Sequence, residues 1–206
     1  MRLQLALDRL SKARCIRLAE DTKPDVDIIE IGTGVIKEYG MSIIREMREL
    51  FPDKTILADM KTCDAAKHEV KQALEAGADI TTVMGFSADA SIKDALKEAE
   101  KLGGQIMIDL LEIQSKQRVE ELASLGVELV SLHIGKDQQS KGSFHEDLFK
   151  LTEGTNLTVA VAGGINAESL PSIVEKDPDI IIVGSTITGQ ENPQKMAGKL
   201  KSYLKK

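Results

Sequence analysis

Short runs of apolar residues, rich in β-branched side chains, recur along the chain at a nearly constant interval. Between them lie longer stretches in which apolar residues return every three or four positions, as at Ile92, Leu96, Ala99 and Leu102. The first pattern is typical of β-strands and the second of amphipathic helices. The strands predicted in this way are residues 3–8, 27–32, 54–61, 79–85, 105–111, 129–135, 156–164 and 179–185.

The alternation of strand and helix predicts parallel strands joined by right-handed crossovers. The eight predicted strands start 23 to 27 residues apart. This period favours a closed (β/α)8 TIM barrel of the α/β class, and a chain of 206 residues leaves no room for long insertions. An open doubly wound sheet is the alternative, but no strand leads into the Gly-x-Gly-x-x-Gly turn of dinucleotide-binding proteins. We therefore expect one barrel domain over residues 1–206.

Composition narrows the class of partner. The chain is 42% hydrophobic and 29% charged, with a net charge of -6. The acidic balance argues against nucleic acid, whereas a few local cations can still bind a small anionic substrate. Two distant cysteines, Cys15 and Cys63, form neither a disulfide framework nor a zinc motif. Because Asp8 interrupts any signal-peptide core and no apolar run approaches ~18 residues, we expect a cytoplasmic protein with no membrane partner.

Charged and polar residues stand at the carboxyl ends of the predicted strands, where (β/α)8 barrels gather their reactive groups. Burying an unpaired charge is costly, so any one of these residues could instead be a paired core residue. Their concentration at one end of the barrel favours a functional site. They are Asp8, Glu30, Asp59, Lys61, Asp109 and His133.

The run from Asp59 to Asp64 is the densest of these groups. Because strand side chains alternate, Asp59 and Lys61 share one face with Leu57 and can point to the barrel axis. Asp64 stands where the next helix should begin, a position at which Asp is a preferred N-cap. The residues predicted to face the helices instead are Ile56, Ala58 and Met60.

Glu30 and Asp59 are hard oxygen ligands at the ends of neighbouring strands. Two carboxylates, completed by substrate oxygens and water, suit Mg²⁺. A zinc site is less favoured, because His133 alone among the three histidines stands at a strand end.

Two glycine-containing turns follow the last two strands. Gly163 and Gly164 precede a helix expected to start near Asn166, and Gly184 and Ser185 close the eighth strand. Backbone N–H groups at helix N-termini bind phosphate, and barrels often hold phosphate after strands seven and eight. We predict that these four residues bind a substrate phosphate.

The pattern Asp59-x-Lys61-x-x-Asp64, together with Asp8 and Glu30, resembles the orotidine-monophosphate decarboxylase suprafamily, and the resemblance runs through all eight units. Its most specific element is the run after the third strand. The resemblance implies a barrel of the ribulose-phosphate-binding type.

Glu30 and His133 resemble the metal-dependent branch, which holds the 3-hexulose-6-phosphate synthases and the 3-keto-L-gulonate-6-phosphate decarboxylases. The run His133-Ile134-Gly135-Lys136-Asp137-Gln138-Gln139 fits the His-x-Gly-x-Asp-x-Gln pattern of the synthases. Lys136 stands where the decarboxylases typically have arginine. The resemblance therefore favours a synthase and leaves a decarboxylase as the alternative.

The resemblance implies a mechanism. Mg²⁺ would bind Glu30, Asp59 and the oxygens of ribulose 5-phosphate. His133 would take a proton from C1, Lys61 would stabilise the resulting 1,2-enediolate, and the enediolate would attack formaldehyde to give a 3-hexulose 6-phosphate. A cation is needed because an enediolate is too basic to form unaided at neutral pH.

The resemblance also assigns Asp8 and Asp64 to holding hydroxyl groups and orienting Lys61. In this family the residue at the position of Asp64 comes from the partner subunit, which implies a homodimer.

Two further alternatives stand beside the decarboxylase. A ribulose-phosphate epimerase needs histidine ligands on the second and third strands, where this chain has Glu30, Asp59 and Lys61. A non-catalytic sugar-phosphate-binding barrel could keep the glycine turns while losing Lys61 or His133, but both residues are present.

Overall fold

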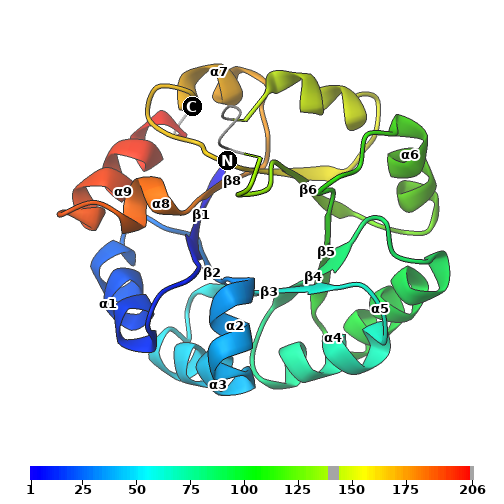
Figure 1. Ribbon diagram of the computed structural model, residues 1–206, viewed down its shortest axis with the longest axis horizontal. Helices are drawn as coiled ribbons and strands as arrows, with labels where there is room; N and C mark the ends of the chain where they lie inside the picture. The colour runs from blue at the N-terminus through cyan, green and yellow to red at the C-terminus, as the bar shows by residue number, and fades with distance from the viewer. Residues whose placement is uncertain (139–143, 205–206) are drawn as a thin grey trace.

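A computed structural model describes residues 1–138 and 144–204. Its eight parallel strands close into one barrel in chain order, with the helices outside (Figure 1). This confirms the predicted (β/α)8 fold. Gln139, which ends the motif after the sixth strand, lies outside the described residues. The strands are β1 (Arg2–Leu7), β2 (Ile28–Ile31), β3 (Thr55–Thr62), β4 (Ile80–Met84), β5 (Gln105–Asp109), β6 (Leu129–His133), β7 (Thr158–Ala162) and β8 (Ile180–Val183).

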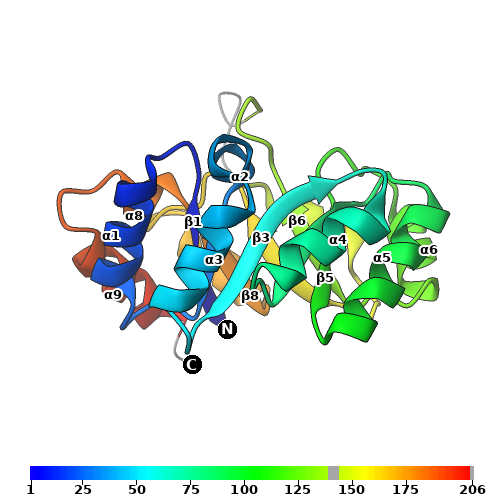
Figure 2. The same cartoon turned by 90° about the horizontal axis from the view of Figure 1, so that it is seen from below.

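The helices surround the strands, as the side view in Figure 2 shows. In the part of the chain that is described, none of them combines the length and apolar character needed to cross a bilayer. A 3-10 helix, η2 (Glu146–Leu151), lies between β6 and β7. The α-helices are α1 (Lys12–Thr22), α2 (Thr33–Tyr39), α3 (Met41–Leu50), α4 (Ala66–Glu75), α5 (Asp89–Leu102), α6 (Lys116–Ser124), α7 (Leu170–Glu175), α8 (Ser185–Thr188) and α9 (Pro193–Tyr203).

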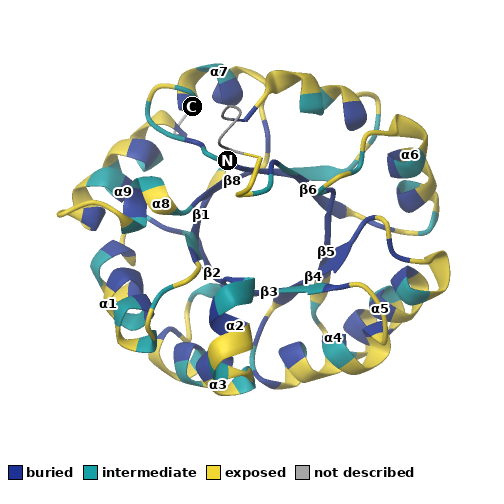
Figure 3. Ribbon diagram, in the orientation of Figure 1, coloured by how far each residue is buried: buried dark blue, intermediate teal, exposed yellow. Residues whose placement is uncertain are grey.

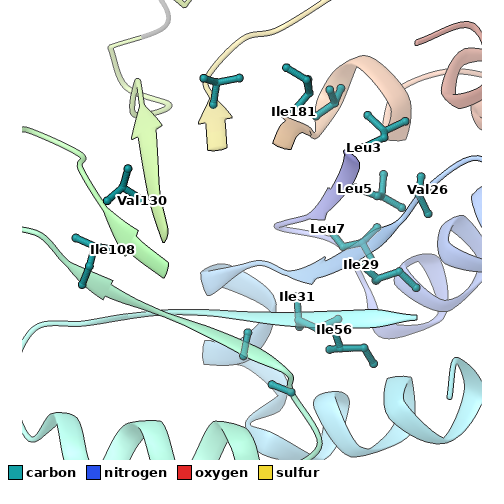
Figure 4. Close-up of a cluster of buried hydrophobic side chains, with 14 of the residues drawn as sticks. Leu3, Leu5, Leu7, Val26, Ile29, Ile31, Ile56, Ile108, Val130 and Ile181 are labelled. Carbon is teal, nitrogen blue, oxygen red and sulfur yellow. The ribbon is translucent and has the colours of Figure 1, made fainter. Parts of the chain in front are cut away.

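Two apolar layers hold the barrel together, because alternate strand residues face opposite sides. Leu57 belongs to the layer inside the barrel, whereas Ile56, Ala58 and Met60 pack in the layer between strands and helices, as predicted. Figure 3 shows the buried strands as a ring inside the more exposed helices, and Figure 4 shows part of the outer layer, including Leu5, Ile29 and Ile56.

Two predicted helix starts are wrong. The helix after β7 begins at Leu170 rather than near Asn166, because Asn166 Oδ1 accepts the N–H groups of Glu168 and Ser169 and forms a turn first. Asp64 is not the N-cap of α4, because Ala65 occupies that position in a left-handed conformation with φ 50°.

Three aspartates tie neighbouring strands together at the amino-terminal rim. Each precedes an even-numbered strand, donates its N–H to a carbonyl of the preceding strand, and accepts the N–H of that same residue. The N–H to carboxylate distances are 2.7, 2.7 and 2.8 Å. The pairs are Asp27 with Leu3, Asp79 with Ile56, and Asp179 with Val159.

Candidate active site

A cavity of about 370 Å³ opens at the carboxyl ends of the strands. It brings together the predicted residues of six strands and their loops. Asp64 does not line it. The predicted residues that do are Asp8, Glu30, Asp59, Lys61, His133, Gly163, Gly164, Gly184 and Ser185.

Asp109 links the proposed base to the proposed cation. The Lys61 Nζ atom lies 2.5 Å from Asp109 Oδ2, and His133 Nδ1 lies 3.1 and 3.0 Å from Oδ1 and Oδ2 of the same carboxylate. An ionised carboxylate only accepts hydrogen bonds, so Nδ1 of the neutral imidazole carries the proton. Nε2 of His133 therefore keeps the lone pair that a general base needs.

The pKa values of this pair follow from their contacts. Burial alone would lower the pKa of His133, but the hydrogen bond and charge of Asp109 outweigh it, so the pKa of His133 is raised. Burial would raise the pKa of Asp109, but its bonds and charge interactions with His133 and Lys61 hold that pKa well below its usual range. Asp109 thus stays ionised, and His133 is a stronger base than free imidazole.

A bulge in β3 places Lys61 in this group. The register between β3 and β4 shifts between Ala58 and Thr62, and Lys61 has φ 49°, a left-handed conformation that is uncommon outside glycine. Its N–H donates to the Thr82 hydroxyl at 2.8 Å, which holds the bulge. Burial favours the neutral amine, but the charges of Asp59 and Asp109 raise the pKa of Lys61, which remains an ammonium group.

Asp59 is heavily occupied by donors. Its Oδ2 accepts the Thr33 hydroxyl and its Oδ1 the Thr82 hydroxyl, both at 2.8 Å. The Lys61 Nζ atom lies 3.2 Å from each of the two oxygens. Asp59 is therefore fixed in place before any ligand binds.

Glu30 has one oxygen to spare. Its Oε2 accepts the Gln4 amide at 2.7 Å, and none of the described residues donates a hydrogen bond to its Oε1. Burial and the nearby charge of Asp59 raise the pKa of Glu30 to about 7. A cation placed beside the two carboxylates would relieve this crowding of negative charge.

The donor set fits Mg²⁺. Carboxylate oxygens are hard ligands, and Mg²⁺ is usually held by one or two carboxylates together with water and substrate oxygens. Among the described residues there is no group of three or more His, Cys, Asp or Glu side chains arranged to hold a metal ion. Water and substrate would therefore complete a shell begun by Glu30 and Asp59.

The loops after β7 and β8 form another wall of the cavity. Gly163 and Gly164 have φ 120° and 67°, and a Cβ on Gly163 would lie 2.7 Å from the Ile134 carbonyl oxygen. Only glycine fits this close approach. The Thr186 hydroxyl donates to the Ile165 carbonyl at 2.7 Å and so joins the two loops.

Polar groups also stand around the mouth of the cavity, where Arg9 and Lys136 contribute to its lining. Asp8 follows β1, accepts the Gly34 N–H at 2.8 Å, and pairs with Arg9 at 3.3 Å. Both cations can meet an anionic substrate at the entrance.

Asp64 lies apart, exposed, among residues at the starts of α4 and α5. Its carboxylate makes no hydrogen bond to another residue in the described ranges, 1–138 and 144–204. Within one chain, then, it cannot hold a substrate in the cavity.

Sequence reasoning assigned no role to four polar residues of the site. Asp109 stood out at a strand end without a function, while Gln4, Thr33 and Thr82 passed unnoticed. A signal existed for Gln4, because positions 4, 6 and 8 share one face of β1 and Gln4 is a polar residue within an apolar run.

Comparison with known proteins completes the description of this site. Residues 1–200 match the family model described as Orotidine 5'-phosphate decarboxylase / HUMPS family. The chain is 38% identical over 207 residues to a 3-hexulose-6-phosphate synthase of Bacillus subtilis (strain 168), covering 99% of each chain.

Solved structures agree closely in fold. A 3-hexulose-6-phosphate synthase from Salmonella typhimurium superposes with a TM-score of 0.96 at 33% identity, over 99% of this chain and 98% of that chain. A KGPDC from Streptococcus mutans in complex with ribose 5-phosphate gives a TM-score of 0.93 at 29% identity, over 99% and 97%.

Proposed function

The chain belongs to the Orotidine 5'-phosphate decarboxylase / HUMPS family, and we propose that it acts there as a 3-hexulose-6-phosphate synthase, joining formaldehyde to ribulose 5-phosphate. The observation that carries this assignment is the contact chain from Lys61 through Asp109 to His133 in the cavity that Glu30 also lines. It places a base, an ammonium group and a free carboxylate oxygen around one space.

His133 starts the reaction. Its Nε2 takes the proton from C1 of ribulose 5-phosphate, and Asp109, which stays ionised, stabilises the imidazolium that forms. A positioned general base of this kind typically contributes about 10²–10⁴-fold to the rate.

Lys61 offsets the negative charge of the 1,2-enediolate, because its ammonium group is already fixed by Asp59 and Asp109. The electron pair at C1 forms the new bond to the carbon of formaldehyde. His133 then returns the proton to the former aldehyde oxygen, and the product is a 3-hexulose 6-phosphate.

Glu30 and Asp59 would hold Mg²⁺ in this proposal. When bound, the ion supplies positive charge that lowers the energy of negatively charged substrate oxygens. The support for this cofactor is the spare oxygen of Glu30 and the raised pKa of its carboxyl group.

The phosphate of the substrate would lie against Gly163, Gly164, Gly184 and Ser185. The positive φ of the first two glycines leaves their backbone uncovered, and Ser185 opens α8. The complex of the S. mutans relative with ribose 5-phosphate supports a sugar phosphate as ligand of this barrel type.

The assembly proposed is a homodimer in which Asp64 serves the partner's site while Asp8 orients substrate hydroxyl groups from within the chain. The position of Asp64 outside its own cavity supports this role. We place the enzyme in the cytoplasm, where its free thiols, Cys15 and Cys63, would remain reduced.

A pair of assays tests the activity. The protein is incubated with Mg²⁺, ribulose 5-phosphate and formaldehyde, and the loss of formaldehyde is followed; in parallel it receives 3-keto-L-gulonate 6-phosphate, and CO2 is followed. We expect fast formaldehyde uptake. Fast CO2 release without formaldehyde uptake would assign the decarboxylase instead, and sugar-phosphate binding without either turnover would assign a binding protein.

Subunit mixing tests the dimer. Lys61→Ala and Asp64→Ala chains are each inactive in this scheme, but a mixed dimer regains one intact site. After unfolding and refolding of an equal mixture, half of the dimers are mixed, so about a quarter of the wild-type activity returns. Each variant refolded alone is the control, and a mixture no more active than the controls would place Asp64 outside the partner's site.

A further inference from the structure

We propose that Gln4 is a positioning residue that aims the free oxygen of Glu30 into the cavity, and that Mg²⁺ binding depends on it. This inference rests on the proposed function, in which Glu30 is a metal ligand. It is carried by a hydrogen bond deep in the barrel and by a polar atom that has no partner there.

Gln4 occupies a place normally filled by apolar side chains. It is fully buried in β1, and its partners in the strand register are Ile28 of β2 and Ile182 of β8, both members of the inner apolar layer. An amide in such surroundings is unfavourable unless it is hydrogen-bonded. Its place two residues before Ala6, the register partner of Glu30, sets it one layer below the carboxylate.

The contact has a direction. The Gln4 amide donates from Nε2 to Glu30 Oε2 at 2.7 Å. An ionised carboxylate only accepts, so the amide must turn its N–H side to Glu30. This fixes Oε2 toward the barrel floor and leaves Oε1 for a ligand in the cavity.

The other half of the amide bears the consequence. Gln4 Oε1 is buried and has no hydrogen-bond partner among the residues described. A buried acceptor without a partner is destabilising. The side chain is thus oriented to serve Glu30 and not to satisfy both of its own polar atoms, which is what a positioning role requires.

The experiment measures Mg²⁺ binding to the full chain by titration calorimetry, without substrate and well below the unfolding temperature. Gln4→Met keeps a side chain of similar length but removes the donor. Loss of an outer-shell partner typically weakens metal binding about 10–100-fold, and we expect that loss here. The matched control is Thr22→Val, which removes a buried hydrogen bond to the Leu18 carbonyl in α1, outside the cavity lining.

Thr22→Val should bind Mg²⁺ like the wild type even where its melting temperature falls as far as that of Gln4→Met. Should Gln4→Met not fold, Gln4→Asn keeps an amide but withdraws the donor by one methylene, and the same loss of affinity is expected.

Wild-type affinity in the folded Gln4 variants would overturn the role of Gln4 and leave the proposed function standing. A wild-type chain that binds no Mg²⁺ would overturn both this inference and the metal-dependent mechanism. Equal weakening in Thr22→Val would show that lost stability, and not the aim of Glu30, sets the affinity, and would also overturn the inference.

Discussion

Carboxylates stand at both rims of the barrel, and their partners differ. At the amino-terminal rim, Asp27, Asp79 and Asp179 each accept a backbone N–H of the preceding strand. At the carboxyl-terminal rim, Glu30 and Asp59 accept from side chains, and the negative charge of one raises the pKa of the other. The same chemical group therefore closes the sheet at one end and gathers reactive charge at the other.

The difference lies in what each carboxylate gains when the chain folds. A lower-rim aspartate satisfies a backbone donor that would otherwise be unpaired. At the upper rim, Asp109 is stabilised as an anion by His133 and Lys61, while burial and Asp59 make ionised Glu30 unfavourable. The upper rim thus stores unfavourable charge that a cation could relieve, and the lower rim stores none of this kind.

The largest effect that this comparison predicts is at His133. His133→Ala should fold normally, because the side chain lies at the cavity and not in either apolar layer. It should lose about 10²–10⁴-fold in the rate of proton exchange at C1 of ribulose 5-phosphate, the usual contribution of a general base. Exchange is followed by NMR in D2O without formaldehyde, which isolates the first step.

The control for this measurement is His68→Ala in α4, which does not line the cavity and should keep its exchange rate. Near-wild-type exchange in folded His133→Ala would remove His133 from the role of base.

Much of this arrangement could be predicted from the sequence. The strand period specifies the barrel, and the alternation within residues 54–61 correctly separates Leu57 from Ile56 and Ala58. Strand ends then collect the candidate residues, because parallel strands in a barrel end at one rim. Only a property that repeats along the chain could be read in this way.

Pairing between distant residues escaped the same reasoning. The bulge that turns Lys61 to φ 49° depends on Thr82 in the next strand, and the orientation of His133 depends on Asp109. The three lower-rim aspartates all precede an isoleucine in the sequence, but their bonds to the preceding strand appear only once the register is known. These features arise from tertiary contacts, which local patterns do not encode.

The next effect concerns stability and pH. A carboxyl group with a raised folded-state pKa favours folding fully below its unfolded pKa of 4.5, and that contribution is lost as pH rises through the folded pKa, about 7 for Glu30. Without metal, Glu30→Gln should therefore be more stable than wild type at pH 8, by up to about 3 kcal/mol, and nearly equal at pH 4.5. Urea unfolding in EDTA at both pH values measures the difference.

Mg²⁺ sharpens this test. In the proposed site it should stabilise the wild type at pH 8 and have little effect on Glu30→Gln, because a ligand stabilises only a protein that binds it. Glu49→Gln, an exposed substitution in α3, is the matched control. A stability difference that is the same at pH 4.5 and pH 8 would show that Glu30 is not under electrostatic strain.

The smallest effect is expected at the lower rim, where Asp79 accepts the Ile56 N–H at 2.7 Å and also pairs with Arg48. Asp79→Ala leaves that N–H without its acceptor and should lower the free energy of unfolding by about 1–3 kcal/mol. Asp79→Asn keeps an acceptor oxygen and loses only the half-exposed ion pair, so its loss should stay within about 1 kcal/mol. Because this rim lies away from the cavity, both variants should keep wild-type turnover below their unfolding temperatures. Equal destabilisation by Ala and Asn would assign the role of Asp79 to its charge, and a loss of turnover in either folded variant would mean that the two rims are coupled.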